Sequence, residues 1–397
     1  MRPVVYGVLP RPPHPTRDGL AIRNFHLLTA LAERFEVRAF TLVDPDRAYG
    51  GGVAPPGVEI ERIPQRARRT RRAGAAARSL VSRRPYSELL YRSAPLERRL
   101  AEACAERTPA WIVAHSYHVA PAALSAGPPV WIDFHNLDSE IWRRVGAAGT
   151  MGPRRAFVRV QEPRLRRLEA SLARQSAGIS CVSDRDREAI ARLAPGPEPV
   201  VVPNGVDLSR YVFRSRPPAS ERILFVGDLS WPPNADAVRW FARNVWPLVR
   251  ERRPGTSVEI VGRDAPPELL AFADGRFAFA GESDDTRPHW EAAAVAIVPL
   301  RVGGGTRLKI LEAAACGVPV VSTRIGAEGL DFADEKELRL GDEPADFAGA
   351  VVALLSDPEA ARRQASAARS RVEERYDWRR IGAEFAEILA ARAAARP

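Results

Sequence analysis

The sequence predicts an α/β protein of two domains, each built around its own parallel β-sheet. Short apolar runs alternate with amphipathic helical patterns along the whole chain, as in parallel sheets whose strands are joined by helices. The 397 residues are too many for one compact core. A turn-rich segment, VPNGVDLSRYVFRSRPP, interrupts the alternation near the middle, and the pattern then restarts. We therefore expect a first domain over residues 1–207 and a second over residues 208–377.

The first half opens with a predicted strand at Val4–Leu9 and a helix at Leu20–Arg34, whose apolar residues recur every three or four positions. Further strands are expected at Val37–Val43, Trp111–Ala114, Val130–Phe134, Gly178–Val182 and Val200–Val202. Ser183 is a predicted helix N-cap, because Asp184 and Asp186 follow it in the first turn. The longest stretch without Asp, Glu, Lys or Arg, residues 108–132, contains prolines and histidines, which favours two strands over a membrane span.

The second half repeats the alternation after the turn-rich segment. Strands are expected at Ile223–Val226, Ser257–Val261, Val295–Pro299 and Val318–Ser322, with helices at Ala235–Arg250 and Arg307–Cys316. Three helices are expected to close the chain, at Pro344–Leu355, Glu359–Tyr376 and Trp378–Ala395.

The net charge of +10 is unevenly distributed along the chain. Residues 66–84 contain eight arginines and no acid, and a second basic run lies between Arg154 and Arg167. Such segments suit nucleic acid, an anionic membrane surface or solvated helix faces. No aromatic-interleaved motif or known nucleic-acid module accompanies them, so we expect no nucleic-acid partner. Solvated helices and attraction to anionic lipid remain open.

The three cysteines form no CxxC pair and have no metal-ligand spacing, which indicates packed thiols in a reducing compartment. The apolar run at Val4–Leu9 is short and is followed by Arg11, not by a signal-peptidase site. We therefore expect a cytoplasmic protein and leave open peripheral attachment at the inner face of the membrane.

An anion site is predicted at VGGGTRLKILEAAACG, which follows the strand Val295–Pro299. Thr306 is a predicted N-cap, yet Arg307 and Lys309 occupy the first turn, where the helix dipole disfavours cations. The amides of Gly303, Gly304 and Gly305, the helix N-terminus and the two cations together suit a diphosphate. Glu312 lies deeper on the same helix face, where a carboxylate accepts two ribose hydroxyls. The alternative is a glycine turn with both cations reaching solvent.

Other nucleotide and metal motifs fit less well. The glycine cluster is followed by Thr-Arg-Leu, not by the Lys-Ser/Thr of a Walker loop, and it lacks the third glycine of a dinucleotide fingerprint. A metal-dependent transferase would need an Asp-x-Asp pair. Asp44 and Asp46 lie in a predicted turn, and Asp184 and Asp186 lie at a capped helix start, so we expect no metal site.

Several segments resemble the retaining, two-domain glycosyltransferases of family 4, which have the GT-B fold. They are GGGTRLKILEAAACGVPVVSTRIGAEGL, FVGDLSWPPNADAVRWFARNVWPLV, DFHNLDSE, SCVSDRDREAI, VPNGVD and YDWRRIGAEFAEIL. The resemblance implies two facing Rossmann-like domains: residues 1–207 on the acceptor side, and residues 208–377 binding the nucleotide-sugar donor. It also implies that residues 378–397 form a helix that crosses back onto the first domain. The resemblance is weaker over residues 49–110, where the acceptor usually binds.

The same resemblance assigns roles in the donor site. Glu312 matches the second glutamate of the family's E-x7-E motif, which holds the donor ribose, but Gly304 stands at the position of the first. The Arg and Lys that usually grip the diphosphate after the domain's first strand are missing, and Asp228 and the uncharged Asn234 occupy that segment. We therefore expect that Arg307 and Lys309 have taken over the phosphate-binding role, with a degenerate site as the alternative.

On the acceptor side, His135 matches a histidine that lies near the donor sugar in similar enzymes. Asp18 and Gly19 match the family's N-terminal loop near the diphosphate and acceptor, and Arg23 is expected to face the same cleft. Asp18 is equally suited to cap the helix that follows.

The implied reaction is transfer of a hexose from a nucleotide diphosphate sugar to a hydroxyl acceptor, including lipid-linked acceptors, with retention and without cofactor or metal. A catalytically inactive partner subunit, a nucleotide-sugar epimerase and a phosphorylase are the alternatives.

Overall fold

The chain is described by a computed structural model over residues 2–16, 18–45, 53–65, 68–147, 153–214, 218 and 220–396. It divides into two compact units, residues 1–203 with 379–397 and residues 204–378. The first unit ends at Pro203, whereas the sequence analysis placed the domain boundary at residue 207. Val206 forms a parallel bridge with Asp377, and its N–H donates to the carbonyl oxygen of Tyr376 at 2.8 Å, so this segment belongs to the second unit.

The first unit contains a seven-stranded parallel sheet in the order β3-β2-β1-β4-β5-β6-β7. The strands are β1 (Val4–Leu9), β2 (Glu36–Val43), β3 (Val58–Pro64), β4 (Trp111–Ala114), β5 (Val130–Phe134), β6 (Gly178–Cys181) and β7 (Val200–Val201). The predicted β1, β4 and β5 are confirmed residue for residue. Strand β3 was not predicted, because it alternates charged and apolar residues at the sheet edge and is only partly buried.

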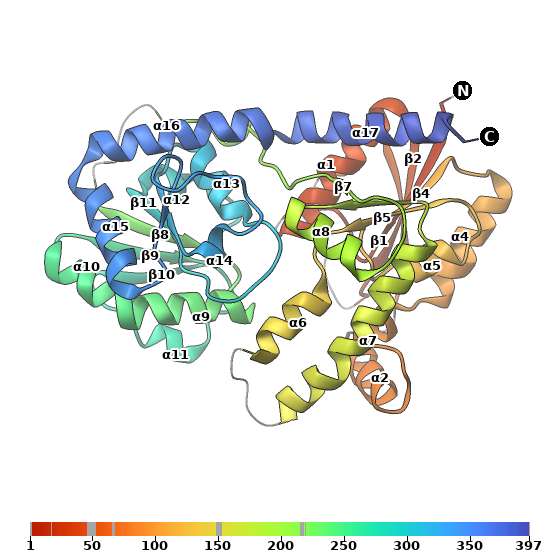
Figure 1. The fold of residues 1–397 in the computed structure, drawn as a ribbon, viewed down its shortest axis with the longest axis horizontal. Helices are drawn as coiled ribbons and strands as arrows, with labels where there is room; N and C mark the ends of the chain where they lie inside the picture. The colour runs from red at the N-terminus through yellow and green to blue at the C-terminus, as the bar shows by residue number, and fades with distance from the viewer. Residues whose placement is uncertain are drawn as a thin grey trace. The chain divides into compact units, whose positions relative to one another are not determined.

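Helices cover this sheet on both faces (Figure 1). They are α1 (Gly19–Arg34), α2 (Arg68–Val81), α3 (Tyr86–Tyr91), α4 (Ala94–Glu106), α5 (Ala120–Leu124), α6 (Asp138–Ala147), α7 (Pro153–Gln175) and α8 (Asp184–Leu193). Ser183 caps α8 as predicted, since its hydroxyl accepts from the N–H of Asp186 at 3.2 Å.

The last helix, α17 (Trp378–Ala394), packs on the first unit, which confirms the expected return of the chain. The indole Nε1 of Trp111 donates to the carbonyl oxygen of Leu389 at 2.9 Å. A Cβ on Gly382 would lie only 2.5 Å from the Cβ of Ala30, so α17 and α1 approach closely here (Figure 1).

The second unit contains a six-stranded parallel sheet in the order β10-β9-β8-β11-β12-β13. Its strands are β8 (Arg222–Val226), β9 (Ser257–Val261), β10 (Phe277–Gly281), β11 (Val295–Val298), β12 (Val320–Ser322) and β13 (Arg339–Leu340). Its helices are α9 (Pro232–Trp240), η1 (Phe241–Val245), α10 (Trp246–Arg252), α11 (Pro267–Leu270), α12 (Arg287–Ala292), α13 (Leu308–Ala315), α14 (Arg324–Ala327), α15 (Pro344–Ser356) and α16 (Pro358–Arg375).

The helix predicted at Ala235–Arg250 is interrupted by the π-helical turn η1. Pro247 explains the interruption, because it lacks an N–H and its ring would clash with the carbonyl four residues earlier in a regular α-helix. The wider π turn relieves that clash.

The cysteines are buried and free, in agreement with the sequence prediction. No helix in the described part of the chain is both long and apolar enough to cross a membrane. Of the basic segment, Arg66 lies outside the described residues, as does Asp46 of the first Asp-x-Asp pair.

Candidate active site

The second sheet has its switch point between β8 and β11, where the strand order reverses. In parallel α/β sheets, ligands bind outside the carboxyl ends of the strands at this point, because the flanking loops run to opposite sides. The segment 227–231 follows β8, and the glycine loop 299–307 follows β11. The predicted anion site therefore lies at the switch point of its own domain.

Lys309, in the first turn of α13, directs its ammonium toward the end of β8. Its Nζ lies 3.1 Å from Oδ1 of Asn234 and 4.0 Å from the ring centroid of Phe225. A Cβ on Gly227 would lie 2.7 Å from the same Nζ, so a larger residue here would displace the ammonium from this position. The ammonium of Lys309, on α13, thus lies at the carboxyl end of β8. Burial, reinforced by repulsion from Arg307, lowers the pKa of the Lys309 ammonium to about 7.

The glycine loop adopts a conformation that other residues rarely adopt. Gly303 has a φ of 149° and Gly305 a φ of 70°. The Arg307 guanidinium folds back onto this loop, where Nη1 donates to the carbonyl oxygens of Gly304 and, at 2.7 Å, Gly305. Arg307 therefore braces the loop, whereas Lys309 reaches the strand end. The two cations expected to act together have different surroundings.

Thr306 does not cap the helix, contrary to the sequence prediction. Helix α13 begins at Leu308 with Arg307 at the N-cap position, and Arg307 makes no side-chain capping bond. The Thr306 hydroxyl instead accepts from Nδ2 of Asn204 at 2.6 Å. The amides at the start of α13 are thus left without the predicted cap.

Glu312 lies one turn into α13 and is held by an aromatic partner that the sequence analysis missed. Nε1 of Trp290, on α12, donates to Oε2 of Glu312 at 3.3 Å. Burial raises the pKa of the Glu312 carboxyl to about 6, and the bonds from Trp290 and Tyr211 oppose part of this rise. Near neutral pH the group is a carboxylate that accepts hydrogen bonds.

Asp228 is engaged by a second residue that the sequence analysis missed. Nε and Nη2 of Arg263, which follows β9, donate to Oδ2 of Asp228 at 2.9 and 2.5 Å. Although partial burial raises the pKa of the Asp228 carboxyl, the bonds from Arg263 and Ser230 bring it below its usual value. Arg263 was detectable in principle, because Asp228 and Arg263 follow neighbouring parallel strands.

In the first unit, Asp18 is the N-cap of α1, and its Oδ1 accepts from the N–H of Ala21 at 3.1 Å. Asp18 also forms an ion pair with Arg11, and Gly19 is the first residue of the helix. The capping role considered for Asp18 is therefore present.

Arg23 does not face a cleft, contrary to the expectation from its helix position. It is fully buried, and Nε and Nη2 donate to the two oxygens of Asp133 at 2.8 and 2.7 Å. Arg23 was expected to point toward a ligand because it lies in the first turns of α1. Its ion pair with Asp133, on β5, instead holds the side chain in the interior.

His135 follows β5, and 14% of its side chain is exposed. Its Nε2 lies 3.0 Å from Oδ2 of Asp133. Burial lowers the pKa of His135 below its usual value although the Asp133 carboxylate raises it, so the imidazole is neutral at pH 7.

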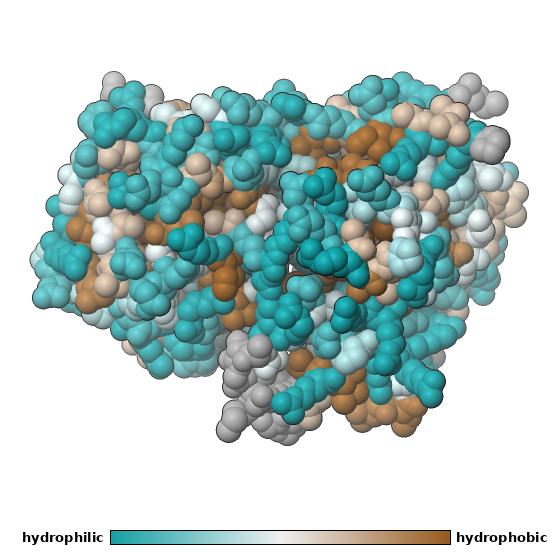
Figure 2. All heavy atoms as spheres, in the orientation of Figure 1, coloured by the Kyte–Doolittle hydropathy of each residue, from teal (hydrophilic) through white to brown (hydrophobic). Residues whose placement is uncertain are grey.

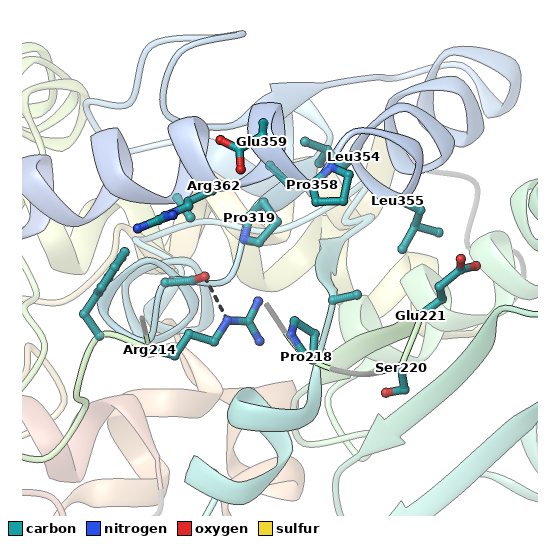
Figure 3. Close-up of a pocket in the computed structure, with 15 residues that line it drawn as sticks. Arg214, Pro218, Ser220, Glu221, Pro319, Leu354, Leu355, Pro358, Glu359 and Arg362 are labelled. Carbon is teal, nitrogen blue, oxygen red and sulfur yellow. Dashed lines mark hydrogen bonds between the residues drawn. The ribbon is translucent and has the colours of Figure 1, made fainter. Parts of the chain in front are cut away.

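A cavity of about 240 Å³ lies elsewhere on the second unit (Figure 3). Glu221, Ala294 and Pro319 line it, and each directly precedes a strand, which places the cavity at the amino ends of the sheet. Nε of Arg214 donates to the carbonyl oxygen of Gly317 there at 3.2 Å (Figure 3). The cavity is thus at the opposite end of the strands from the candidate site.

Two family profiles match the chain. A Glycosyl transferase 4-like domain covers residues 18–205, and Glycosyl transferases group 1 covers residues 220–357. Together with two parallel sheets and a site at the switch point of the second, they define the class of protein: a GT-B glycosyltransferase-like fold. The chain belongs to family 4 of the glycosyltransferases, the glycosyl transferases group 1.

Individual relatives agree with this assignment. Glycogen synthase of Mycobacterium tuberculosis is 31% identical over 242 residues, which cover 56% of each protein. The chain thus spans about half the length of the curated relatives it matches. Sucrose-phosphate synthase of Thermosynechococcus elongatus superposes with a TM-score of 0.76 at 16% identity, over 99% of this chain and 100% of that structure. Anabaena HepE in complex with UDP and glucose superposes with a TM-score of 0.69 at 15% identity, over 98% and 100%.

Proposed function

We propose that this protein transfers a hexose from a nucleotide diphosphate sugar to a hydroxyl acceptor, with retention of anomeric configuration. One observation carries the proposal: the Lys309 ammonium occupies the end of β8, where the resemblance places the diphosphate-binding cations. An anion there would meet this ammonium and the N-terminus of α13. We assign Lys309 to the diphosphate, Glu312 to the donor ribose and His135 to the donor sugar.

The negative charge that develops on the leaving diphosphate would be stabilised by fixed groups of the protein. A preorganised donor of this kind typically contributes about 10²–10³ in rate. Arg307 contributes indirectly, by holding the glycine loop through two carbonyls. We assign Asn234 a supporting role, since Oδ1 accepts from Lys309 and Nδ2 donates to the carbonyl oxygen of Asp228 at 2.9 Å.

We expect transfer to continue undiminished in excess EDTA, because the proposal assigns the charge on the diphosphate to Lys309 and helix amides. The product's new glycosidic bond should have the anomeric configuration of the donor, as a proton NMR spectrum of the product will show. A rate that falls in EDTA and returns with Mg²⁺ or Mn²⁺ would contradict the metal-independent mechanism. An inverted product would contradict retention.

A second candidate is a catalytically inactive partner subunit. Gly304 in place of the first glutamate favours it, as does the engagement of Asp228 by Arg263. Nucleotide binding separates the two, since the enzyme must bind a nucleoside diphosphate and this inactive subunit would not. An epimerase would convert the donor in the absence of any acceptor.

We propose a membrane-bound or lipid-linked acceptor on the basis of one surface of the first unit, here called the basic–apolar surface. It comprises α2, the segment 82–84 and α7. Leu80 and Val81 are 71% and 89% exposed at the end of α2, and Val160 on α7 is 46% exposed. Nη1 of Arg164 donates to the carbonyl oxygen of Ser79, which joins the two helices. Apolar atoms gather at the lower edge of the molecule, over α2 and the adjoining end of α7 (Figure 2).

Exposed apolar side chains flanked by arginines fit a surface of anionic lipid, where each basic residue contributes about 1 kcal/mol. We expect the protein to float with vesicles that contain phosphatidylglycerol at low salt and to detach at high salt. The double variant Leu80→Ser/Val81→Ser should detach more readily, whereas Leu270→Ser, at a 47% exposed position of the second unit, should not. Flotation that is equal at both salt concentrations would contradict electrostatic attachment.

A further inference from the structure

A fully buried ion pair joins α1 to β5 in the first unit. Arg23 and Asp133 are both 0% exposed, and their side chains make two charge-assisted bonds of 2.8 and 2.7 Å. Such a pair contributes little net stability compared with an apolar replacement, because both charges lose their hydration. Its position therefore calls for an explanation other than stability alone.

Each partner has a second set of contacts. Oγ of Ser180, on β6, donates to Oδ1 of Asp133 at 2.7 Å. Nη1 of Arg23 donates to the carbonyl oxygens of Val202 at 2.9 Å and Pro203 at 3.1 Å. Pro203 is the last residue of the first unit before the chain enters the second. Ser180 on β6 thus holds Asp133 in place, and Arg23 in turn holds the backbone of Val202 and Pro203.

Oδ2 of Asp133, which accepts from Nε of Arg23, also lies 3.0 Å from Nε2 of His135. We propose that Arg23 and Asp133 are positioning residues that hold His135 in one tautomer and one orientation. The inference rests on the proposed function for its catalytic meaning. Nε2 of His135 lies 3.0 Å from the Asp133 carboxylate without the alignment of a hydrogen bond, and an unprotonated Nε2 would turn its lone pair toward the negative charge. The Nε2–H tautomer is therefore favoured, which leaves Nδ1 of the neutral imidazole as the hydrogen-bond acceptor. Arg23 keeps Asp133 ionised and fixes both carboxylate oxygens.

Charged and titratable groups surround His135 on several elements. Asp133 lies on β5 itself, Arg23 on α1 and Arg11 in the loop after β1, while His115 and His118 follow β4. Both neighbouring imidazoles have a lowered pKa caused first by burial, about 4 for His115 and about 3 for His118. They are neutral at pH 7, so the fixed charges near His135 are Asp133 and the two arginines.

The first test uses the unaltered protein. The chain has six histidines, so ¹⁵N-labelled imidazole spectra can be assigned by comparison with His135→Gln. We expect His135 to be the Nε2–H tautomer at pH 7, and an Nδ1–H tautomer would overturn the proposal. Because this spectrum requires neither donor nor acceptor, it stands even if the proposed reaction fails.

The second test separates positioning from simple support of the fold. Asp133→Asn keeps the size of the side chain but removes its charge, so His135 should lose its fixed tautomer and its pKa should fall. In the proposed reaction, kcat should fall about tenfold to a hundredfold with little change in the donor KM, the range known for partners that orient the histidines of metal sites. Arg23→Lys should retain more activity than Arg23→Met, because it preserves the charge next to Asp133.

Ser180→Ala serves as the milder variant if Asp133→Asn folds poorly. It removes one bond to Oδ1 and leaves the ion pair in place, so His135 should keep its tautomer with a small change in pKa. A purely structural role would lower thermal stability in these variants and leave the His135 spectrum and the kcat of the folded protein unchanged. That outcome would overturn the proposal.

Discussion

Lys309→Met is expected to reduce strongly the thermal stabilisation that nucleotides give to this protein. The substitution removes the ammonium from the end of β8 and keeps an unbranched side chain against Phe225. A charge-assisted bond to phosphate contributes about 1.5–3 kcal/mol, so affinity should fall roughly tenfold to a hundredfold or more. Wild type should be stabilised by one of UDP, GDP, ADP or dTDP, by about 2.7 kcal/mol at 100 times its dissociation constant. That nucleotide would also identify the donor's base.

The chain supplies its own control for this experiment. It has two lysines, and Lys336 is exposed in the loop before β13. Lys336→Met changes the net charge equally and should leave the nucleotide shift intact. Arg307→Met should weaken binding indirectly, through disorder of the glycine loop. If Lys309→Met retains the full shift, Lys309 does not bind the diphosphate. If wild type shows none, the inactive-subunit interpretation is favoured.

The position of the glycine loop and of α13 after β11 could be predicted from the sequence, because its determinants are local. The glycines, Lys309 and Glu312 lie within ten residues of one another on one loop and helix, and the alternation of strands and helices located that loop after β11. The sequence also indicated that the cations after β8 were missing. It could not show that Lys309 would reach that strand, since the contact with Asn234 spans 75 positions of the chain.

The errors of the sequence analysis arise from long-range partners. Arg23 was assigned to a cleft by its place in α1, but its partner Asp133 is 110 positions away. Thr306 has a side chain suited to an N-cap, yet its hydroxyl accepts a hydrogen bond from Asn204, which lies 102 positions earlier in the chain. In both cases a side chain compatible with a local role is drawn to a tertiary partner, and single-sequence patterns do not contain that information.

Affinity for the intact nucleotide sugar is expected to peak between about pH 6 and pH 7 and to fall on both sides. Lys309 has a pKa of about 7 in the free protein, and a bound diphosphate would raise it. Binding above pH 7 must therefore be accompanied by proton uptake, so affinity falls by up to tenfold per pH unit as the pH rises. Glu312 has a pKa of about 6 and must be ionised to accept both ribose hydroxyls. Below pH 6 binding must release that proton, and affinity falls again.

The choice of ligand and variant makes this profile specific to the two residues. A nucleotide sugar is the right probe, because each of its two phosphates carries one ester bond and shares one anhydride bond. Neither therefore titrates near neutral pH, unlike the terminal phosphate of a nucleoside diphosphate. Isothermal titration calorimetry in buffers of different ionisation enthalpy should show that binding of the nucleotide sugar takes up a proton at pH 8 and releases one at pH 5.5. Glu312→Gln should remove the acidic limb and keep the alkaline one, since it leaves Lys309 in place. An alkaline limb that is absent from wild type would contradict either the lowered pKa of Lys309 or its contact with the diphosphate. The nucleotide shift of Lys309→Met distinguishes these two outcomes.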